Sequence, residues 1–196
     1  MPKRVFAAEE KEKIRLAMLE AGFPLIKEYG MTHTTVSKLT EAAGIAKGTF
    51  YHFWKNKEEY MTELILYHRQ KIAPLLLGED VISGKRKICR YDAKKYLLAV
   101  VDTDVSIYPH MTLDDEAKIF KSSDIFKPDI EKDSAVTGGL IAYAENVRPD
   151  INIPLIANMS KILVITAESR EELLDSVYQE TIDVLIEAIL NQIFEE

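Results

Sequence analysis

Apolar residues recur at every third or fourth position along most of the chain, which is the spacing of one face of an α-helix. Runs of alternating polar and apolar residues, which would predict strands, do not occur. Gly30, Pro74 and Gly78 stand where apolar stripes stop, and such residues commonly end helices. The pattern predicts an all-α fold of about nine helices. The expected helices cover 8–29, 36–42, 46–53, 57–73, 91–105, 112–121, 128–145, 155–167 and 169–194.

Helix ends are also marked by polar residues. Thr34 is expected to cap the helix over 36–42, and Asn56 with Glu59 forms a capping box for the helix that begins at 57. Ser169 with Glu172 predicts the start of the last helix in the same way. The stretch 78–90, which bears glycines and charges, is expected to be a linker.

The last helix has a polar stripe that is too narrow for a helix buried on one side only. Its apolar arc is wider than one core face needs, so the surplus is expected to pack on a second molecule. Together with the preceding helix it would form a four-helix interface between two subunits. The arc consists of Leu173, Leu174, Val177, Tyr178, Ile182, Val184, Leu185, Ile186, Ala188, Ile189, Leu190 and Ile193.

The segment 34–59, TTVSKLTEAAGIAKGTFYHFWKNKEE, has the layout of a helix-turn-helix. Gly44 supplies the turn, because glycine tolerates the left-handed backbone that ends a helix. The second helix would bury Ile45, Phe50 and Trp54 and turn its other side outward.

The outward side of that helix carries residues suited to DNA. Lys47 can neutralise a phosphate or reach a guanine edge, and Thr49 can contact a base. Tyr51 and His52 can donate to phosphate oxygens, which fixes the register without reading sequence. The expected DNA-binding residues are Thr34, Thr35, Lys47, Gly48, Thr49, Tyr51, His52 and Lys57.

The spacing of several of these residues resembles the DNA-binding domain of the tetracycline-repressor (TetR) family of bacterial transcription regulators, over roughly 14–64. The residues that carry the resemblance are Thr35, Val36, Leu39, Ala43, Gly44, Ile45, Lys47, Gly48, Thr49, Phe50, Tyr51, Lys57, Glu58 and Glu59. Three departures stand out. Ala46 lacks the side chain of a usual helix cap, Trp54 replaces a usual Phe, and Pro24 should kink the first helix.

The resemblance implies a DNA-binding domain over 1–56 and a regulatory domain over 57–196 that binds a ligand and forms a homodimer. It implies a palindromic double-stranded operator and a small hydrophobic or aromatic ligand in a cavity of the second domain. The candidates for that cavity are His68, Tyr96, Val100, Tyr108, Met111, Phe120, Phe126, Gly139, Tyr143 and Met159. Each of them could equally be a plain core residue.

The charge distribution fits this organisation, although the net charge of the 196 residues is −7. Residues 1–57 hold ten Lys/Arg and six Asp/Glu, so this part is basic while the remainder is acidic. One cysteine, Cys89, excludes a disulfide framework. The absence of a targeting segment or a membrane-length apolar run predicts a cytoplasmic protein without membrane contact, and the resemblance implies a bacterial one.

Motifs for catalysis or nucleotide binding are missing from the sequence. There is no G-x-S-x-G, P-loop, G-x-G-x-x-G or H-E-x-x-H, and the four histidines are scattered. We therefore expect no enzyme activity, no cofactor and no metal. Two functions stay open: a ligand-released repressor, and a DNA-bound architectural or division-control protein whose body binds a protein partner. An apolar pocket in the body would favour the first.

Overall fold

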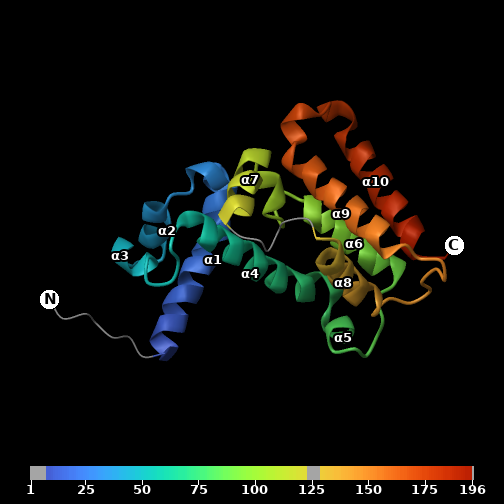
Figure 1. Ribbon diagram of the computed structural model, residues 1–196, viewed down its shortest axis with the longest axis horizontal. Coiled ribbons are helices and arrows are strands. Elements are labelled where there is room, and N and C mark those ends of the chain that lie inside the picture. Colours follow the sequence, from blue (N-terminus) through green and yellow to red (C-terminus); the bar gives the residue numbers. More distant parts are fainter. Residues whose placement is uncertain (1–7, 123–128, 196) are drawn as a thin grey trace.

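The computed structural model describes residues 8–122 and 129–195, and these residues form ten α-helices and three short 3-10 helices. The all-α fold predicted from the hydrophobic pattern is confirmed. Figure 1 shows α2 and α3 at one end of the molecule and α9 and α10 at the other, with α4 running between them. No helix among the described residues is both long and apolar enough to cross a membrane.

The first four helices form the end of the molecule that carries the helix-turn-helix. They are α1 (Ala8–His33), α2 (Val36–Ala42), α3 (Lys47–Phe50) and α4 (Lys57–Leu77).

The remaining elements build the larger part of the molecule. Isolated β-bridges join Ile88 to Ala144 and Val147 to Phe194, and so hold three connecting segments together. The elements are α5 (Glu79–Ile82), α6 (Arg90–Val101), η1 (Tyr108–His110), α7 (Leu113–Ser122), α8 (Ile130–Ile141), α9 (Ile153–Glu168), η2 (Arg170–Glu172), η3 (Asp175–Val177) and α10 (Tyr178–Ile193).

Several helix ends differ from the sequence prediction. Gly30 breaks the helical backbone with a φ of 73°, as expected, but helical structure resumes and α1 ends at His33. Thr35, and not Thr34, caps α2, because its hydroxyl oxygen accepts from Lys38 N. Pro74 lies inside α4 rather than ending it, and the helix stops at Gly78, whose φ is 81°.

The two largest corrections concern α3 and α10. The second helix of the motif spans four residues instead of eight, and i→i+3 bonds from His52 and Phe53 tighten the chain after it. The last helix begins at Tyr178 rather than at Ser169, because the chain between them forms the 3-10 turns η2 and η3. The proposed capping box therefore leads only into η2.

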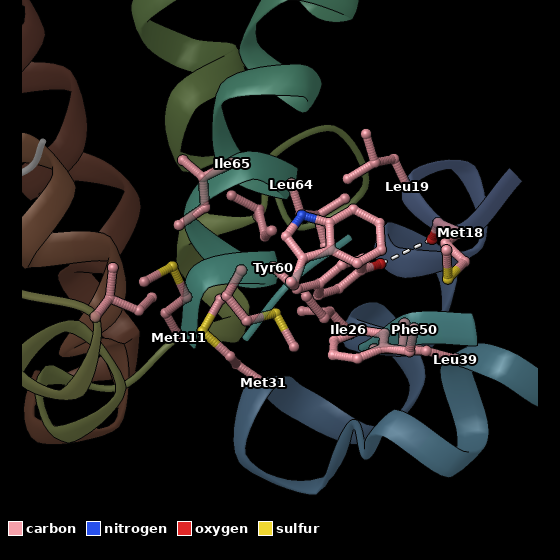
Figure 2. Close-up of a cluster of buried hydrophobic side chains, with 14 of the residues drawn as sticks. Met18, Leu19, Ile26, Met31, Leu39, Phe50, Tyr60, Leu64, Ile65 and Met111 are labelled. Atoms are coloured by element: carbon pink, nitrogen blue, oxygen red, sulfur yellow. Dashed lines mark hydrogen bonds between the residues drawn. The ribbon is translucent and has the colours of Figure 1, made fainter. Parts of the chain in front are cut away.

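A core of large side chains joins α1, α2, α3 and the first half of α4 (Figure 2). Trp54, Tyr60 and Phe50 lie at its centre, and each is no more than 2% exposed. The core continues into Met111 and Ile119, on or next to α7. The boundary expected at residue 56 thus falls beside side chains of α4 that belong to the amino-terminal core, and the division 1–56 and 57–196 stays a prediction.

Gly22 lets α4 approach α1 closely. A Cβ at this position would overlap the Tyr60 hydroxyl and would lie 2.6 Å from a methyl of Leu64. The Tyr60 hydroxyl donates to the Met18 carbonyl oxygen at 2.8 Å, which ties the two helices together at the same place (Figure 2).

A second apolar core lies between α6, α9 and α10. Ile182, Ile186, Ile189 and Leu190 of α10 are at most 1% exposed. The apolar arc of the last helix therefore divides into a part that fills this core and a part that faces outward.

Candidate DNA-binding surface and ligand cavity

The exposed face of α2 and α3 gathers most of the residues expected to bind DNA. Thr35, Lys47, Gly48, Tyr51 and His52 are exposed, and Tyr51 keeps 53% of its surface accessible. Gly48 has no atom within 4 Å of a Cβ position, so this face stays flat and open there. Phosphate oxygens or base edges could reach these donors without moving the backbone.

Aromatic rings under α3 hold this face in place. Phe50 packs on Trp54 at 5.2 Å and on Tyr60 at 5.5 Å between ring centroids. Trp54 Nε1 donates to Glu63 at 2.6 Å, and Glu63 also pairs with Arg15. The larger ring of Trp54 thus fills the core and anchors α3 to both α1 and α4, which compensates for the missing cap at Ala46.

Three of the expected residues lie differently. Thr34 is fully buried, and its hydroxyl donates to the Gly30 carbonyl oxygen at 2.8 Å. Thr49 is half-buried. Lys57 Nζ donates to the carbonyl oxygens of Met31 and Thr32, at 2.6 and 2.9 Å, and burial lowers its pKa below the ordinary value. In this structure Lys57 therefore caps the carboxyl end of α1 by binding two of its last carbonyl oxygens.

A cavity of about 330 Å³ lies between α4, α6, α8, α9 and α10. Most of its wall is aliphatic, as is typical of sites for small organic molecules. Four of the ten residues proposed from the sequence line it, namely His68, Tyr96, Val100 and Tyr108.

Four of the other six candidates lie away from the cavity wall. Met111 packs into the amino-terminal core and Met159 against the core around α10. Tyr143 is 64% exposed, and Gly139 has nothing within 4 Å of its Cβ position. Residue Phe126 and the side chain of Phe120 lie outside the described part of the chain.

Arg69 was not among the predicted residues, yet it lines the cavity beside Tyr108. Arg69 Nε donates to the Tyr108 hydroxyl at 2.5 Å, and a second guanidinium nitrogen contacts the same oxygen. The sequence holds one signal for it. Arg69 follows His68 on a helix whose apolar stripe continues at Ile72, so it lies at the edge of that stripe.

His68 lies at the same end of the cavity. Its Nε2 donates to the Val105 carbonyl oxygen at 2.7 Å, and burial lowers the pKa of the ring. The imidazole is therefore neutral near pH 7 and leaves Nδ1 as an acceptor. No group of three or more His, Cys, Asp or Glu side chains in the described segments could hold a metal ion.

Known proteins were compared with the chain. The family described as "Bacterial regulatory proteins, tetR family" matches residues 18–64, which span the end of α1 through the first turns of α4. These are the residues that build the exposed α2–α3 face and its aromatic support. This part of the chain, residues 18–64, therefore belongs to the tetR family.

One curated relative of this chain is the fatty acid metabolism regulator protein of Bacillus subtilis (strain 168). The two are 26% identical over 110 residues, which make up 54% of this chain and 55% of the relative. The chain thus aligns with about half the length of that relative.

Solved structures share the fold at low identity. A putative TetR-family regulator from Mesorhizobium loti matches with a TM-score of 0.58 at 14% identity, covering 94% of this chain and 98% of that one. NalD of Pseudomonas aeruginosa, described as the secondary repressor of the MexAB-OprM multidrug efflux pump, matches with a TM-score of 0.51 at 16% identity, covering 95% and 99%. In these two matches the shared fold extends over 94% and 95% of this chain.

The chain also presents an apolar strip on α9 and α10. Ile162 is 50% exposed and Val184 is 68% exposed, although both lie on helices whose other faces fill the core. Leu155 and Ile165 extend the strip along α9, and Val177 extends it before α10. Exposed apolar side chains gathered on two neighbouring helices are typical of a protein interface.

Proposed function

We propose that this tetR-family chain is a sequence-specific DNA-binding transcription regulator that a small molecule in the cavity releases from its operator. The observation that carries the proposal is the course of α4. Its first turns pack under the exposed α2–α3 face, and its later turns, from His68 to Leu77, line the cavity. One rigid element therefore connects a DNA-facing surface to a ligand-sized space.

The proposed DNA contacts divide into two groups. Lys47, Tyr51 and His52 contact phosphates and, with Thr49 and the flat Gly48, enter the major groove. Thr35 caps α2, and because it is exposed it also contacts a phosphate. Thr34 and Lys57 act as positioning residues, because both bond to carbonyl oxygens at the end of α1.

We propose a homodimer that forms through the exposed strip on α9 and α10. Two copies of these helices would build a four-helix interface, and the two α3 helices would read half-sites of a palindrome about 34 Å apart. The outward-facing apolar side chains of α9 and α10, such as Ile162 and Val184, support this arrangement.

Release from the operator follows from the geometry of the two DNA-binding ends of the dimer, each of which carries one α3 helix. A ligand that shifts the later turns of α4 moves the amino-terminal core with it, and the spacing of the two α3 helices changes. The ligand must bind the DNA-incompetent form more tightly, with a typical coupling of roughly 1–3 kcal/mol. The metabolic regulator of Bacillus subtilis supports control of this kind.

The apolar cavity supports this function over the architectural alternative, in which the body would be filled and would bind a protein. Regulators of this kind work by binding alone, so we propose no catalytic role for the chain.

The DNA-binding surface is tested by selecting the duplexes that the protein binds from a random-sequence pool. The affinity of the protein for the most strongly selected duplex is then measured. The double variant Lys47→Ala/Tyr51→Ala should bind it at least about tenfold more weakly, because two contacts are lost. Its matched control is Lys85→Ala/Tyr91→Ala, which removes the same residue types from exposed positions of the body. Equal affinity of both double variants would contradict the assigned surface.

A further inference from the structure

The wall of the cavity changes in polarity from one end to the other. The turn of α4 nearest the amino-terminal core contributes His68 and Arg69, and the segment before and into η1 contributes Ser106 and Tyr108. These four residues bring a cation, a hydroxyl pair and an imidazole to one end. The end where Val105 meets His68 is therefore the polar end of the cavity.

The opposite end is aliphatic. Leu76 and Leu77 close it from α4, and Ile193 and Phe194 close it from the end of α10. Ile88 and Ala144, which the β-bridge holds together, complete this end. Phe194 is 4% exposed and Leu77 is 9% exposed, so this end excludes water and suits hydrocarbon.

The distance between the two ends follows from the helix that lines both. Nine residues separate His68 from Leu77, and a rise of 1.5 Å per residue makes this about 14 Å along α4. The cavity is therefore elongated, and Tyr96 and Ser160 also line it. A flat aromatic ring system would leave one end unfilled, whereas a flexible chain could occupy the length.

The polar end selects by charge. The Arg69 guanidinium is a cation whose donors form a fork that matches a carboxylate or a phosphate. The Tyr108 hydroxyl accepts from Arg69, so its own proton points elsewhere and can be donated to a ligand oxygen. Burial raises the pKa of Tyr108, which keeps that proton in place.

One acidic group lies within electrostatic range of Tyr108, and it does not oppose an anion near pH 7. Glu168 on α9 is 8% exposed, and burial raises its pKa to about 8. Its carboxyl group is therefore mostly neutral under ordinary conditions. Arg69 itself belongs to the exposed residues, so a charged head group there would keep part of its hydration.

We propose that the cavity binds an anionic amphiphile with an unbranched aliphatic tail. The head group accepts hydrogen bonds from Arg69 and Tyr108, and the tail runs along α4 toward Phe194. This inference rests on the proposed function, since it names the class of ligand that would occupy the same cavity. A carboxylate and a phosphate monoester share the head-group chemistry that Arg69 recognises.

The test is calorimetric titration of the full chain with four probes of equal tail length, each below its aggregation concentration. These are decanoate, decyl phosphate, decanol and decyltrimethylammonium. At least one anion should bind about tenfold or more tightly than the alcohol, and the cation should bind most weakly. The stronger of the two anions identifies the head group. Equal affinity for the alcohol and both anions, or preference for the cation, would overturn the proposal.

Two variants locate the head group. Arg69→Gln should remove the preference for the anion over the alcohol while decanol affinity stays unchanged, and Tyr108→Phe should reduce the preference in part. The control is Lys71→Gln, which removes a cation that lies two residues away on α4 and pairs with Glu20 outside the cavity. If Arg69→Gln kept the full preference for the anion, the assigned polar end would be wrong.

Operator affinity, measured on the same preparations, separates this proposal from the proposed function. Binding of the anion without release of the selected operator would leave the site standing and contradict the release mechanism. Operator binding that depends on Lys47, with no amphiphile bound, would overturn the ligand class and leave the DNA-binding function intact.

Discussion

Glu168 is a carboxyl group that the fold keeps from water without giving it a hydrogen-bond partner among the described residues. Burial raises its pKa to about 8, and the neighbouring charge of Glu116 acts in the same direction. Lys161 on the same helix opposes the shift, and Asp115 on α7 adds to it. An isolated carboxylate in such a place is costly, so the neutral form predominates in the folded protein.

The consequence is a stability that depends on pH. Between the ordinary pKa of 4.5 and the folded value of about 8, the folded state binds more protons than the unfolded state, so stability falls as pH rises through this window. Glu168→Gln should remove this dependence. We expect the variant to be more stable than the wild type near pH 8, by on the order of 1–3 kcal/mol, with the difference shrinking toward pH 5.

Urea unfolding at several pH values measures this difference. The control is Glu171→Gln, an exposed residue beyond the end of the same helix, for which no pH-dependent difference is expected. If the free energy of unfolding of Glu168→Gln ran parallel to that of the wild type from pH 5 to pH 8, the Glu168 carboxyl group would be ionised in the folded protein.

The absence of a side chain at Gly22 allows α1 and α4 to pack closely. Gly22→Ala should destabilise the protein by roughly 1–3 kcal/mol, because the added Cβ meets the Tyr60 hydroxyl and the methyls of Leu64. Gly139→Ala in α8 is the matched control. It has open space around it and should be neutral or stabilising by up to about 1 kcal/mol. Denaturant midpoints of the two variants that shifted alike would contradict the close approach of α1 and α4.

At the scale of the helices, local signals explain what the sequence could predict. Apolar spacing placed α2 to the residue although its cap is Thr35 and not Thr34, and the Asn56 cap placed the start of α4 at Lys57. The end of α4 and the start of α10 were missed because tertiary packing overrode the local signals. Pro74 is tolerated within the last turn of α4, and residues 169–177 form 3-10 turns despite a capping pattern.

The two candidate sites differ in how far the sequence could specify them. The candidate DNA-binding residues lie within one short segment, so their spacing placed five of the eight on one exposed face, whereas Thr34 is buried and Thr49 and Lys57 are half-buried. The cavity is assembled from five helices distant in sequence, and only His68, Tyr96, Val100 and Tyr108 of ten candidates line it. Arg69 was missed because a charged residue at the edge of an apolar stripe looks like an ordinary surface residue until η1 brings Tyr108 to it.

At the scale of the whole molecule, the exposed strip on α9 and α10 determines how the two DNA-binding ends of the dimer would be held. The helical pattern predicts that Leu185 and Ile189 belong to the interface between subunits. In the structure Ile189 is 1% exposed and lines the cavity, and Leu185 packs on the core. Charges there would damage the fold itself. Ile162 and Val184 are the residues that face outward.

Ile162→Glu combined with Val184→Glu should therefore give a folded monomer. Each charge would be desolvated at the centre of the proposed four-helix interface, whereas in the free chain it faces water. Sedimentation should show the shift to monomer, circular dichroism should show unchanged helicity, and operator affinity should fall by about tenfold or more, since one DNA-binding end alone reads half a palindrome. The control pair Ile130→Glu with Tyr143→Glu places equal charge on exposed positions of α8 and just beyond it, and should leave the dimer intact. A dimer that survives Ile162→Glu/Val184→Glu while the α8 pair dissociates it would move the interface to α8.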